Sequence, residues 1–184
     1  PSLFAITVDW ATADDTALLF LENPPPPTTT LTPDTTQTRS DVTVDTLQDN
    51  TYEGSETLFV NLSNVSGTAT IADNQGLGTI TDETDIPTIS ISDPTVTEGG
   101  TLTFTITLSN PSLFAITVDW ATADDTALAG LDYTTVAATT LTFNAGETSH
   151  DVTVDTTQDN TYEGSETLFV NLSNVSGTAT IADN

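Results

Sequence analysis

The sequence repeats itself with a period of 110 residues, and this repeat limits the folds that the chain can adopt. Such a period indicates that each repeat is one structural unit, so the 184 residues are expected to hold two small related domains. One block recurs without change, and a second block recurs with Thr157 in place of Leu47. The blocks are residues 1–18 with 111–128, and residues 41–74 with 151–184.

Alternating apolar and polar residues predict β-strands along the whole chain. The alternation is strict in Thr101–Leu108, which is the two-residue period of a half-buried strand. Phe114, Ile116, Val118 and Trp120 form the inward face of the next predicted strand. Turn residues separate the strands at the spacing of a β-sandwich, and no segment has helical periodicity. We therefore predict an all-β protein. The aromatic residues assigned to its core are Trp10, Phe104, Phe114 and Trp120.

The repeat is out of phase with the chain ends. Residues 75–110 occur once and contain an acidic, proline-marked link at Asp82–Pro87. A boundary inside this link predicts one domain at 1–85 that lacks its first strands, and one at 86–184 that lacks its last strand. Either the chain is a piece of a longer tandem array, or neighbouring chains add the missing strands to exposed sheet edges. The expected partners are identical neighbouring subunits or repeats in a fibrous assembly.

The two copies differ most between the matched blocks. Residues 19–40 and 129–150 have equal length but agree at only six positions. The first copy carries four consecutive prolines, and Pro33 stands where the second copy has Phe143. Because proline cannot donate a ladder hydrogen bond, the strand here should be lost or pushed to a sheet edge. We assign no function to residues 19–40.

The charge balance excludes several kinds of partner. There are 27 Asp and Glu residues against a single basic residue, Arg39, and the formal net charge is −26. Nucleic acids and anionic lipids both require Lys or Arg, so neither is an expected partner. No apolar run approaches the roughly 20 residues of a membrane span. The acidic surface has two open interpretations: it confers solubility, or divalent cations such as extracellular calcium neutralise it.

The sequence does not favour an enzyme. The acidic pair Asp124 and Asp125 recurs in both copies and could in principle serve a glycosidase. However, the only histidine, His150, is replaced by Ser40 in the first copy, and no Ser–His–Asp set repeats. The chain has no cysteine, which excludes disulfides, thiolate metal sites and cysteine nucleophiles. We therefore expect no catalytic activity.

Several motifs occur in an order that resembles the Calx-beta family, the calcium-binding β-sandwich of sodium–calcium exchangers, integrin β4 and many bacterial surface proteins. The resemblance covers essentially the whole 110-residue unit and implies tandem seven-stranded, immunoglobulin-like sandwiches. The matching stretches are Val96–Gly100, Thr126–Ala127 through Ala129–Tyr133, Leu141–Thr148, Asp159–Leu168 and Gly78–Asp82.

The resemblance also implies a set of calcium ligands at one end of each sandwich. In the second copy these are Glu98, Asp132, Asp159, Glu163 and Glu166. The first copy offers Glu22, Asp49, Glu53 and Glu56, and the carboxylates after its last strand are Asp82, Glu83 and Asp85. Independently of the family, Ca²⁺ takes six to eight oxygen ligands, and a loop with three carboxylates beside two other acidic loops can supply them. Since Gln158 and Asn160 flank Asp159, where strong binders carry a run of Asp, the resemblance implies weak binding or few ions.

The expected function is a structural repeat module of an extracellular filament, stalk or adhesin at the cell surface, stabilised by Ca²⁺ at domain junctions. The alternative is a calcium-sensing or ligand-binding ectodomain module. Four Asn-x-Ser sequences also allow N-linked glycans. Their acceptors are Asn61, Asn64, Asn171 and Asn174.

Overall fold

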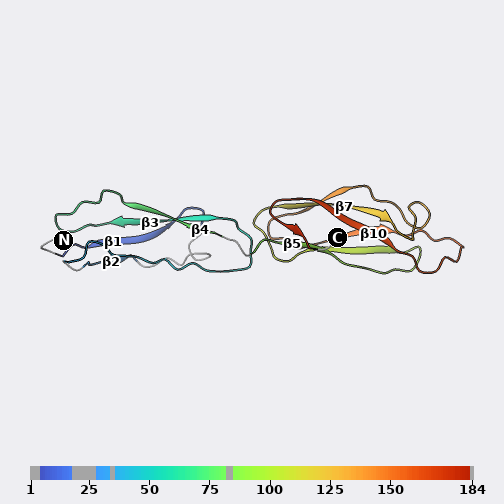
Figure 1. The fold of residues 1–184 in the computed structure, drawn as a ribbon, viewed down its shortest axis with the longest axis horizontal. Coiled ribbons are helices and arrows are strands. Elements are labelled where there is room, and N and C mark those ends of the chain that lie inside the picture. Colours follow the sequence, from blue (N-terminus) through green and yellow to red (C-terminus); the bar gives the residue numbers. More distant parts are fainter. Residues whose placement is uncertain (1–4, 18–27, 34–35, 82–84, 183–184) are drawn as a thin grey trace. The chain divides into compact units, whose positions relative to one another are not determined.

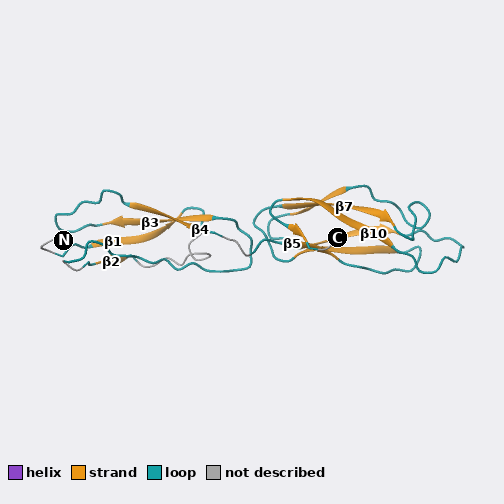
Figure 2. Cartoon of the chain, in the orientation of Figure 1, coloured by secondary structure: helices purple, strands orange, loops and turns teal. Residues whose placement is uncertain are grey.

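A computed structural model describes residues 5–17, 28–33, 36–81 and 85–182. All regular structure in these ranges is β-strand, as Figure 2 shows, so the all-β prediction is confirmed. No helix long and apolar enough to cross a membrane occurs among these residues. The chain divides into two compact units: unit 1 comprises Pro1–Asp49 and Gly54–Asp82, and unit 2 comprises Asn50–Glu53 and Glu83–Asn184.

Unit 1 contains one antiparallel sheet with the strand order β2-β1-β3-β4 (Figure 1). The buried side chains of this unit include Trp10 and Leu58, which lie on the two central strands, and Ala17. The strands are β1 (Val8–Asp14), β2 (Thr29–Leu31), β3 (Glu56–Ser63) and β4 (Gln75–Ile80).

Unit 2 is a sandwich of two sheets, with the strand orders β10-β7-β8 and β11-β5-β6-β9. All pairings are antiparallel except the one between β11 and β5, which is parallel. Its strands are β5 (Thr88–Ile91), β6 (Thr101–Leu108), β7 (Ile116–Asp124), β8 (Thr139–Phe143), β9 (Ser149–Asp155), β10 (Leu168–Ser176) and β11 (Thr180–Ile181).

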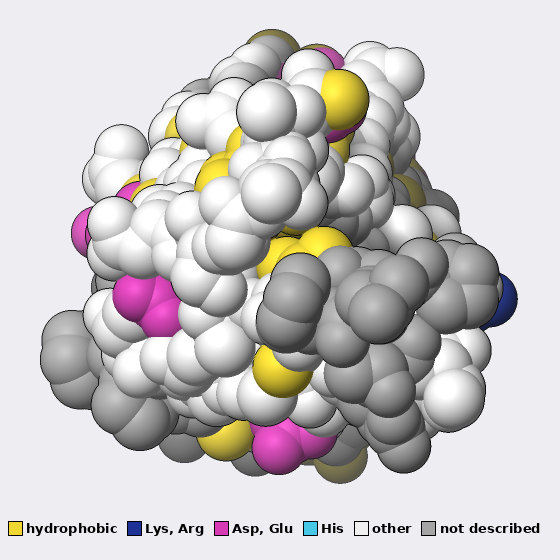
Figure 3. Space-filling model, turned by 90° about the vertical axis from the view of Figure 1, so that its left-hand side faces the viewer, with side chains coloured by type: hydrophobic (Ala, Val, Ile, Leu, Met, Phe, Trp, Pro, Cys, Tyr) yellow, Lys and Arg dark blue, Asp and Glu magenta, His cyan; other side chains and the backbone are white. Residues whose placement is uncertain are grey.

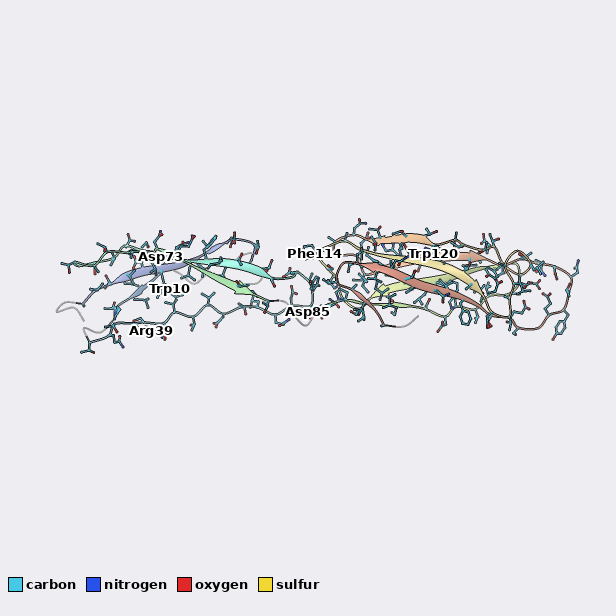
Figure 4. The ribbon with its side chains drawn as sticks, turned by 45° about the horizontal axis from the view of Figure 1, so that its top comes forward. Trp10, Arg39, Asp73, Asp85, Phe114 and Trp120 are labelled. Atoms are coloured by element: carbon cyan, nitrogen blue, oxygen red, sulfur yellow. The ribbon has the colours of Figure 1, made fainter. Side chains whose placement is uncertain are left out.

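The core of unit 2 lies between the inner faces of these sheets. Every second residue of β6, from Leu102 to Leu108, is buried, as the strict alternation in the sequence predicts. Trp120 of β7 is buried, as is its counterpart Trp10 of β1, and Figure 4 labels both. In unit 2 the opposite sheet removes the apolar faces of β6 and β7 from water, which is the main stabilising contribution in such a sandwich.

The core assignment of Phe114 was wrong. Its side chain is 55% exposed, and it precedes β7, which begins at Ile116 (Figure 4). The backbone N–H of Phe114 donates to Ser112 Oγ at 3.0 Å, which places the residue in a turn. The inward alternation therefore starts at Ile116, because the turn breaks the two-residue period before the strand begins.

The effect of Pro33 agrees with the prediction. β2 and its counterpart β8 pair with β1 and β7 in the same register, with Val8 opposite Leu31 and Val118 opposite Leu141. Both strands lie at the edge of their sheets, but β8 continues to Phe143, whereas β2 ends at Leu31, two residues before Pro33. Loss of the ladder donor accounts for the shorter strand.

Candidate metal centre

Five carboxylates lie in three loops at one end of the unit 2 sandwich. Glu98 belongs to the turn between β5 and β6, and Asp132 to the turn between β7 and β8. Asp159, Glu163 and Glu166 belong to the long loop between β9 and β10. The strand pairings bring these loops to the same end, because Thr101 of β6 lies opposite Asp155 of β9.

The carboxylates form two groups of three. Glu98, Asp159 and Glu163 make one group, and Asp132, Glu163 and Glu166 make the other. Within each group, one oxygen from every side chain lies within 4.8 Å of the others. Asp132 is half-buried, and the other four are exposed. Glu163 is the member that the two groups share, so both depend on the position of its side chain.

A close approach joins the β5–β6 turn to the β9–β10 loop. The N–H of Asp159 donates to Glu98 Oε1 at 2.9 Å. Gly99 has a φ of +81°, and a Cβ atom there would lie 2.8 Å from Cβ of Gln158. Only glycine accommodates both the left-handed backbone and this contact. The Glu-Gly-Gly turn therefore positions the Glu98 carboxylate against the β9–β10 loop.

The turn that carries Asp132 is anchored in the core. Tyr133 is 1% exposed, and its hydroxyl donates to Asp124 Oδ1 at 2.6 Å. The same oxygen accepts the N–H of Ala129 at 2.8 Å, and the Asp132 carboxylate accepts the N–H of Leu128 at 2.7 Å. Sequence reasoning missed the positioning role of Asp124 and Tyr133, although Tyr133 is the last residue of the Gly-Leu-Asp-Tyr motif at 130–133.

The contact between buried Tyr133 and exposed Asp124 also changes the pKa values of both groups. Burial, together with the Asp124 carboxylate, raises the pKa of Tyr133 to about 12. The hydrogen bonds from Tyr133 and Ala129 lower the pKa of Asp124. Asp124 thus stays ionised and accepts both hydrogen bonds at the near-neutral pH at which proteins are normally handled.

Replacing Tyr133 by Phe is expected to lower the melting temperature of unit 2 by about 4–8 °C, because Asp124 loses a buried donor. The same substitution should weaken calcium binding, since it loosens the turn that holds Asp132. Tyr162→Phe is the matched control: it deletes the same hydroxyl from a side chain that is 96% exposed and should leave the melting temperature unchanged. Equal effects of the two variants in thermal melts would contradict the anchoring role.

Glu163 has an unfavourable electrostatic environment in the absence of a cation. Desolvation by the surrounding loops raises its pKa, and the nearby charges of the other four carboxylates raise it further. The carboxylates named as causes are Asp132, Asp159, Glu166 and Glu98. A bound cation would reverse this repulsion, because it offers each carboxylate a positive partner.

The donor set fits calcium. Oxygens that bind one Ca²⁺ at about 2.3–2.6 Å lie at most about 5 Å apart, which matches the spacing within each group. Three carboxylates that bind through one or both oxygens supply three to six ligands, and water can complete the shell. Exposed loops of this kind suit the variable geometry of Ca²⁺ better than the strict octahedron of Mg²⁺.

The predicted ligands of the first copy are not members of the two groups found among the described residues. Among the described residues, no group of three carboxylates includes Asp49, Glu53 or Glu56. Glu53 belongs to unit 2, whereas Asp49 and Glu56 belong to unit 1. Asp85 lies before β5, at the end of the β5–β6 hairpin opposite Glu98, and its carbonyl accepts a hydrogen bond from Asn110. Glu22, Asp82 and Glu83 lie outside the described residues, so their role as ligands stays a prediction.

Other candidate groups have structural contacts. Asp125 accepts a hydrogen bond from Thr167 Oγ1 at 2.5 Å. His150 lies 2.9 Å from Glu147 and packs edge-on against Phe143. Among the possible glycosylation sites, Asn64 and Asn174 adopt left-handed backbone and donate to aspartates in β1 and β7. Glycosylation stays a prediction.

Comparison with protein families gives a match to the Calx-beta domain over residues 5–82 and again over 82–183. The two matches together span nearly the whole sequence. The chain belongs to the Calx-beta family. The predicted tandem of Calx-beta sandwiches is therefore confirmed. The comparison with curated proteins gives no match.

Solved Calx-beta structures resemble the chain at low identity. The crystal structure of CBD12 from CALX1.2 is 18% identical, with a TM-score of 0.44 over 93% of this chain and 68% of that one. The calcium-binding domain CBD12 of CALX1.1 is 19% identical, with a TM-score of 0.42 over 81% and 61%. The apo form of the Calx CBD1 domain is 23% identical, with a TM-score of 0.43 over 45% and 73%.

Proposed function

We propose that the chain is a structural repeat module of an extracellular filament, stalk or adhesin. In this proposal Ca²⁺ binds the five carboxylates at the end of the unit 2 sandwich and stiffens the junction with an adjacent unit. Strands from adjacent units complete the sheets. The observation that carries the proposal is Glu163, which is shared by two groups of three carboxylates and has a raised pKa.

The acidic surface supports an extracellular setting. Its 27 acidic side chains are accompanied by a single Lys or Arg, Arg39, which pairs with Asp41 at 2.7 Å. Figure 3 shows one face on which magenta carboxylates are separated by white polar and backbone atoms. Calcium sites of extracellular modules have dissociation constants of about 0.1–1 mM, which suits exposed loops with few formal charges. The surrounding fluid would then keep such a site occupied.

Repetition supports a structural role over a catalytic one. The near-identical copies place the same strand sequences at fixed spacing, and domains of this kind join into long, quasi-one-dimensional objects. The acidic pair that could serve a glycosidase is instead used in hydrogen bonds to Tyr133, Ala129 and Thr167. We therefore propose no enzymatic activity.

The test is a thermal melt of the chain in 10 mM calcium and in chelator. For a site with a dissociation constant of about 1 mM, calcium stabilises the folded state by about 1.4 kcal/mol. For a domain of about 100 residues, this corresponds to a rise in melting temperature of about 6–10 °C. Magnesium at the same concentration is the control and should give a smaller rise. A shift below about 1 °C in calcium would rule out the metal-stabilised module.

Small-angle scattering in the same two buffers separates this function from a calcium sensor. A structural module should become stiffer or assemble in calcium, with little change inside each sandwich. A sensor should instead undergo a conformational change at one site, without assembly. The second outcome would replace the proposed function.

A further inference from the structure

Four residues of the first repeat belong to the second unit. Asn50–Glu53 are part of unit 2, whereas the chain on both sides of them is part of unit 1. Within unit 2 this segment lies against the turn between β6 and β7, residues 109–115, where Tyr52 and Ser112 form an isolated parallel bridge. Unit 2 is therefore not built from the second repeat alone.

Two main-chain hydrogen bonds fix the register of this contact. The N–H of Tyr52 donates to the carbonyl of Pro111, and the N–H of Leu113 donates to the carbonyl of Tyr52, both at 2.9 Å. The Tyr52 ring also meets the ring of Phe114 edge-on, with the ring centroids 6.1 Å apart. Main-chain bonds of this kind give a docked segment its affinity, and a specific side-chain contact gives it selectivity.

The turn that receives the segment is held in place by unit 2 itself. Asn110 is 7% exposed, and its side-chain amide donates to the carbonyl of Asp85. Ser112 is 2% exposed, and its carbonyl accepts the N–H of Gly146 at 2.9 Å. Neither bond involves the docked segment. The turn therefore presents a surface whose shape is set by the sandwich.

The partial burial of Tyr52 comes from this surface and not from its own loop. Residues 48–56 and 158–166 have the same sequence. Tyr52 is half-buried, whereas its counterpart Tyr162 is 96% exposed. The same loop sequence thus covers its tyrosine where it meets the β6–β7 turn.

We propose that the β6–β7 turn of a repeat is a docking surface for the Asn-Thr-Tyr-Glu segment of the repeat before it. The occupant in this chain is Asn50–Glu53, and Tyr52 is its anchor. The contact requires no cation, because it consists of main-chain hydrogen bonds and a contact between two rings. The inference rests on the proposed structural module and names a contact that joins its consecutive repeats without metal.

Substitution of Tyr52 in the full chain tests the docking. Tyr52→Ala is expected to lower the melting temperature of unit 2, followed by the amide signals of β6, by about 4–8 °C, because the ring contact is lost. Tyr52→Phe keeps the ring and should lower it by less than about 2 °C. Tyr162→Ala truncates the same side chain in the same local sequence, where it is 96% exposed, and should leave the melting temperature unchanged.

Hydrogen exchange of a single amide reports the docking directly. The N–H of Leu113 donates to Tyr52, so it should be protected in the parent chain and exchange at least about tenfold faster in Tyr52→Ala. A double-mutant cycle with Phe114→Ala isolates the ring contact. Once either ring is removed, removal of the other should cost little, because both substitutions delete the same contact.

All measurements are made in chelator, so that their outcome does not depend on the metal. The docking surface would be overturned by an unprotected Leu113 amide in the parent chain, or by equal effects of Tyr52→Ala and Tyr162→Ala. Additive effects of Tyr52→Ala and Phe114→Ala would overturn it as well. A calcium-dependent melt alongside such a result would leave the calcium proposal intact, and the reverse pattern would leave the docking surface intact.

Discussion

Replacing Glu163 by Gln is expected to abolish most of the calcium-dependent rise in melting temperature, leaving less than about 2 °C. Glu163 is the carboxylate common to both groups of three, so its loss leaves only two carboxylates in each. In chelator the same substitution should raise the melting temperature by about 1–3 °C, because it removes the charge that the other four carboxylates repel. A cation site is therefore indicated if Glu163→Gln lowers the melting temperature in calcium and raises it in chelator.

The pH dependence of stability provides a second measurement of the repulsion between Glu163 and the other carboxylates. The pKa of Glu163 is raised in the folded state, so the folded chain holds this proton more tightly than the unfolded chain does. The resulting stability is fully present below the unfolded pKa and is lost as the pH rises through the folded pKa. In chelator, the parent should therefore lose more stability than Glu163→Gln as the pH rises through this range. Calcium should remove the difference, because the bound ion favours the ionised carboxylate.

The matched control is Glu53→Gln. Glu53 and Glu163 have identical neighbours, Asn-Thr-Tyr before and Gly-Ser-Glu after, but only Glu163 lies in a described group of three carboxylates. We expect Glu53→Gln to keep the full calcium effect, as measured by thermal melts and by calorimetric titration. If Glu53→Gln lost the calcium effect and Glu163→Gln kept it, the metal centre would have to be moved to the first copy.

The sequence predicted the strands of unit 2 and the carboxylates that meet in it. Both rest on local signals: strict alternation fixes which side of β6 is buried, and the acidic residues sit in loops between predicted strands. The exposed position of Phe114 was not predictable by alternation, because its turn depends on a hydrogen bond to Ser112. The Tyr133–Asp124 hydrogen bond was not predictable from alternation either, because it joins the end of β7 to the following turn through a side chain.

The first copy shows the limit of local signals most clearly. Residues 41–45 and 151–155 have the same sequence, Asp-Val-Thr-Val-Asp, yet only the second segment is a strand, β9. β9 pairs with β6, whereas among the described residues no strand pairs with residues 41–45. These residues therefore form no ladder, although their β propensity is the same. Strand formation here is decided by the tertiary partner and not by the segment.

This difference predicts very unequal effects of one substitution made at matched positions. Val154 of β9 is 1% exposed in the core of unit 2, whereas its counterpart Val44 is half-buried. Val154→Asp would place a charge in an apolar core that offers it no cation, at a cost of about 4 kcal/mol or more. Because this is a large share of the stability of a small domain, unit 2 should be largely unfolded at 25 °C.

Val44→Asp should be tolerated, because its side chain can turn toward water. The amide NMR spectra decide between these outcomes: Val154→Asp should lose the dispersed signals of β6 and β9, and Val44→Asp should keep them. Val154→Ala, which removes two methyl groups, should lower stability by about 2 kcal/mol and keep unit 2 folded. If Val44→Asp unfolded its unit as completely as Val154→Asp, residues 41–45 would have to be packed in a core, and the lack of a pairing strand among the described residues could not explain why they form no ladder.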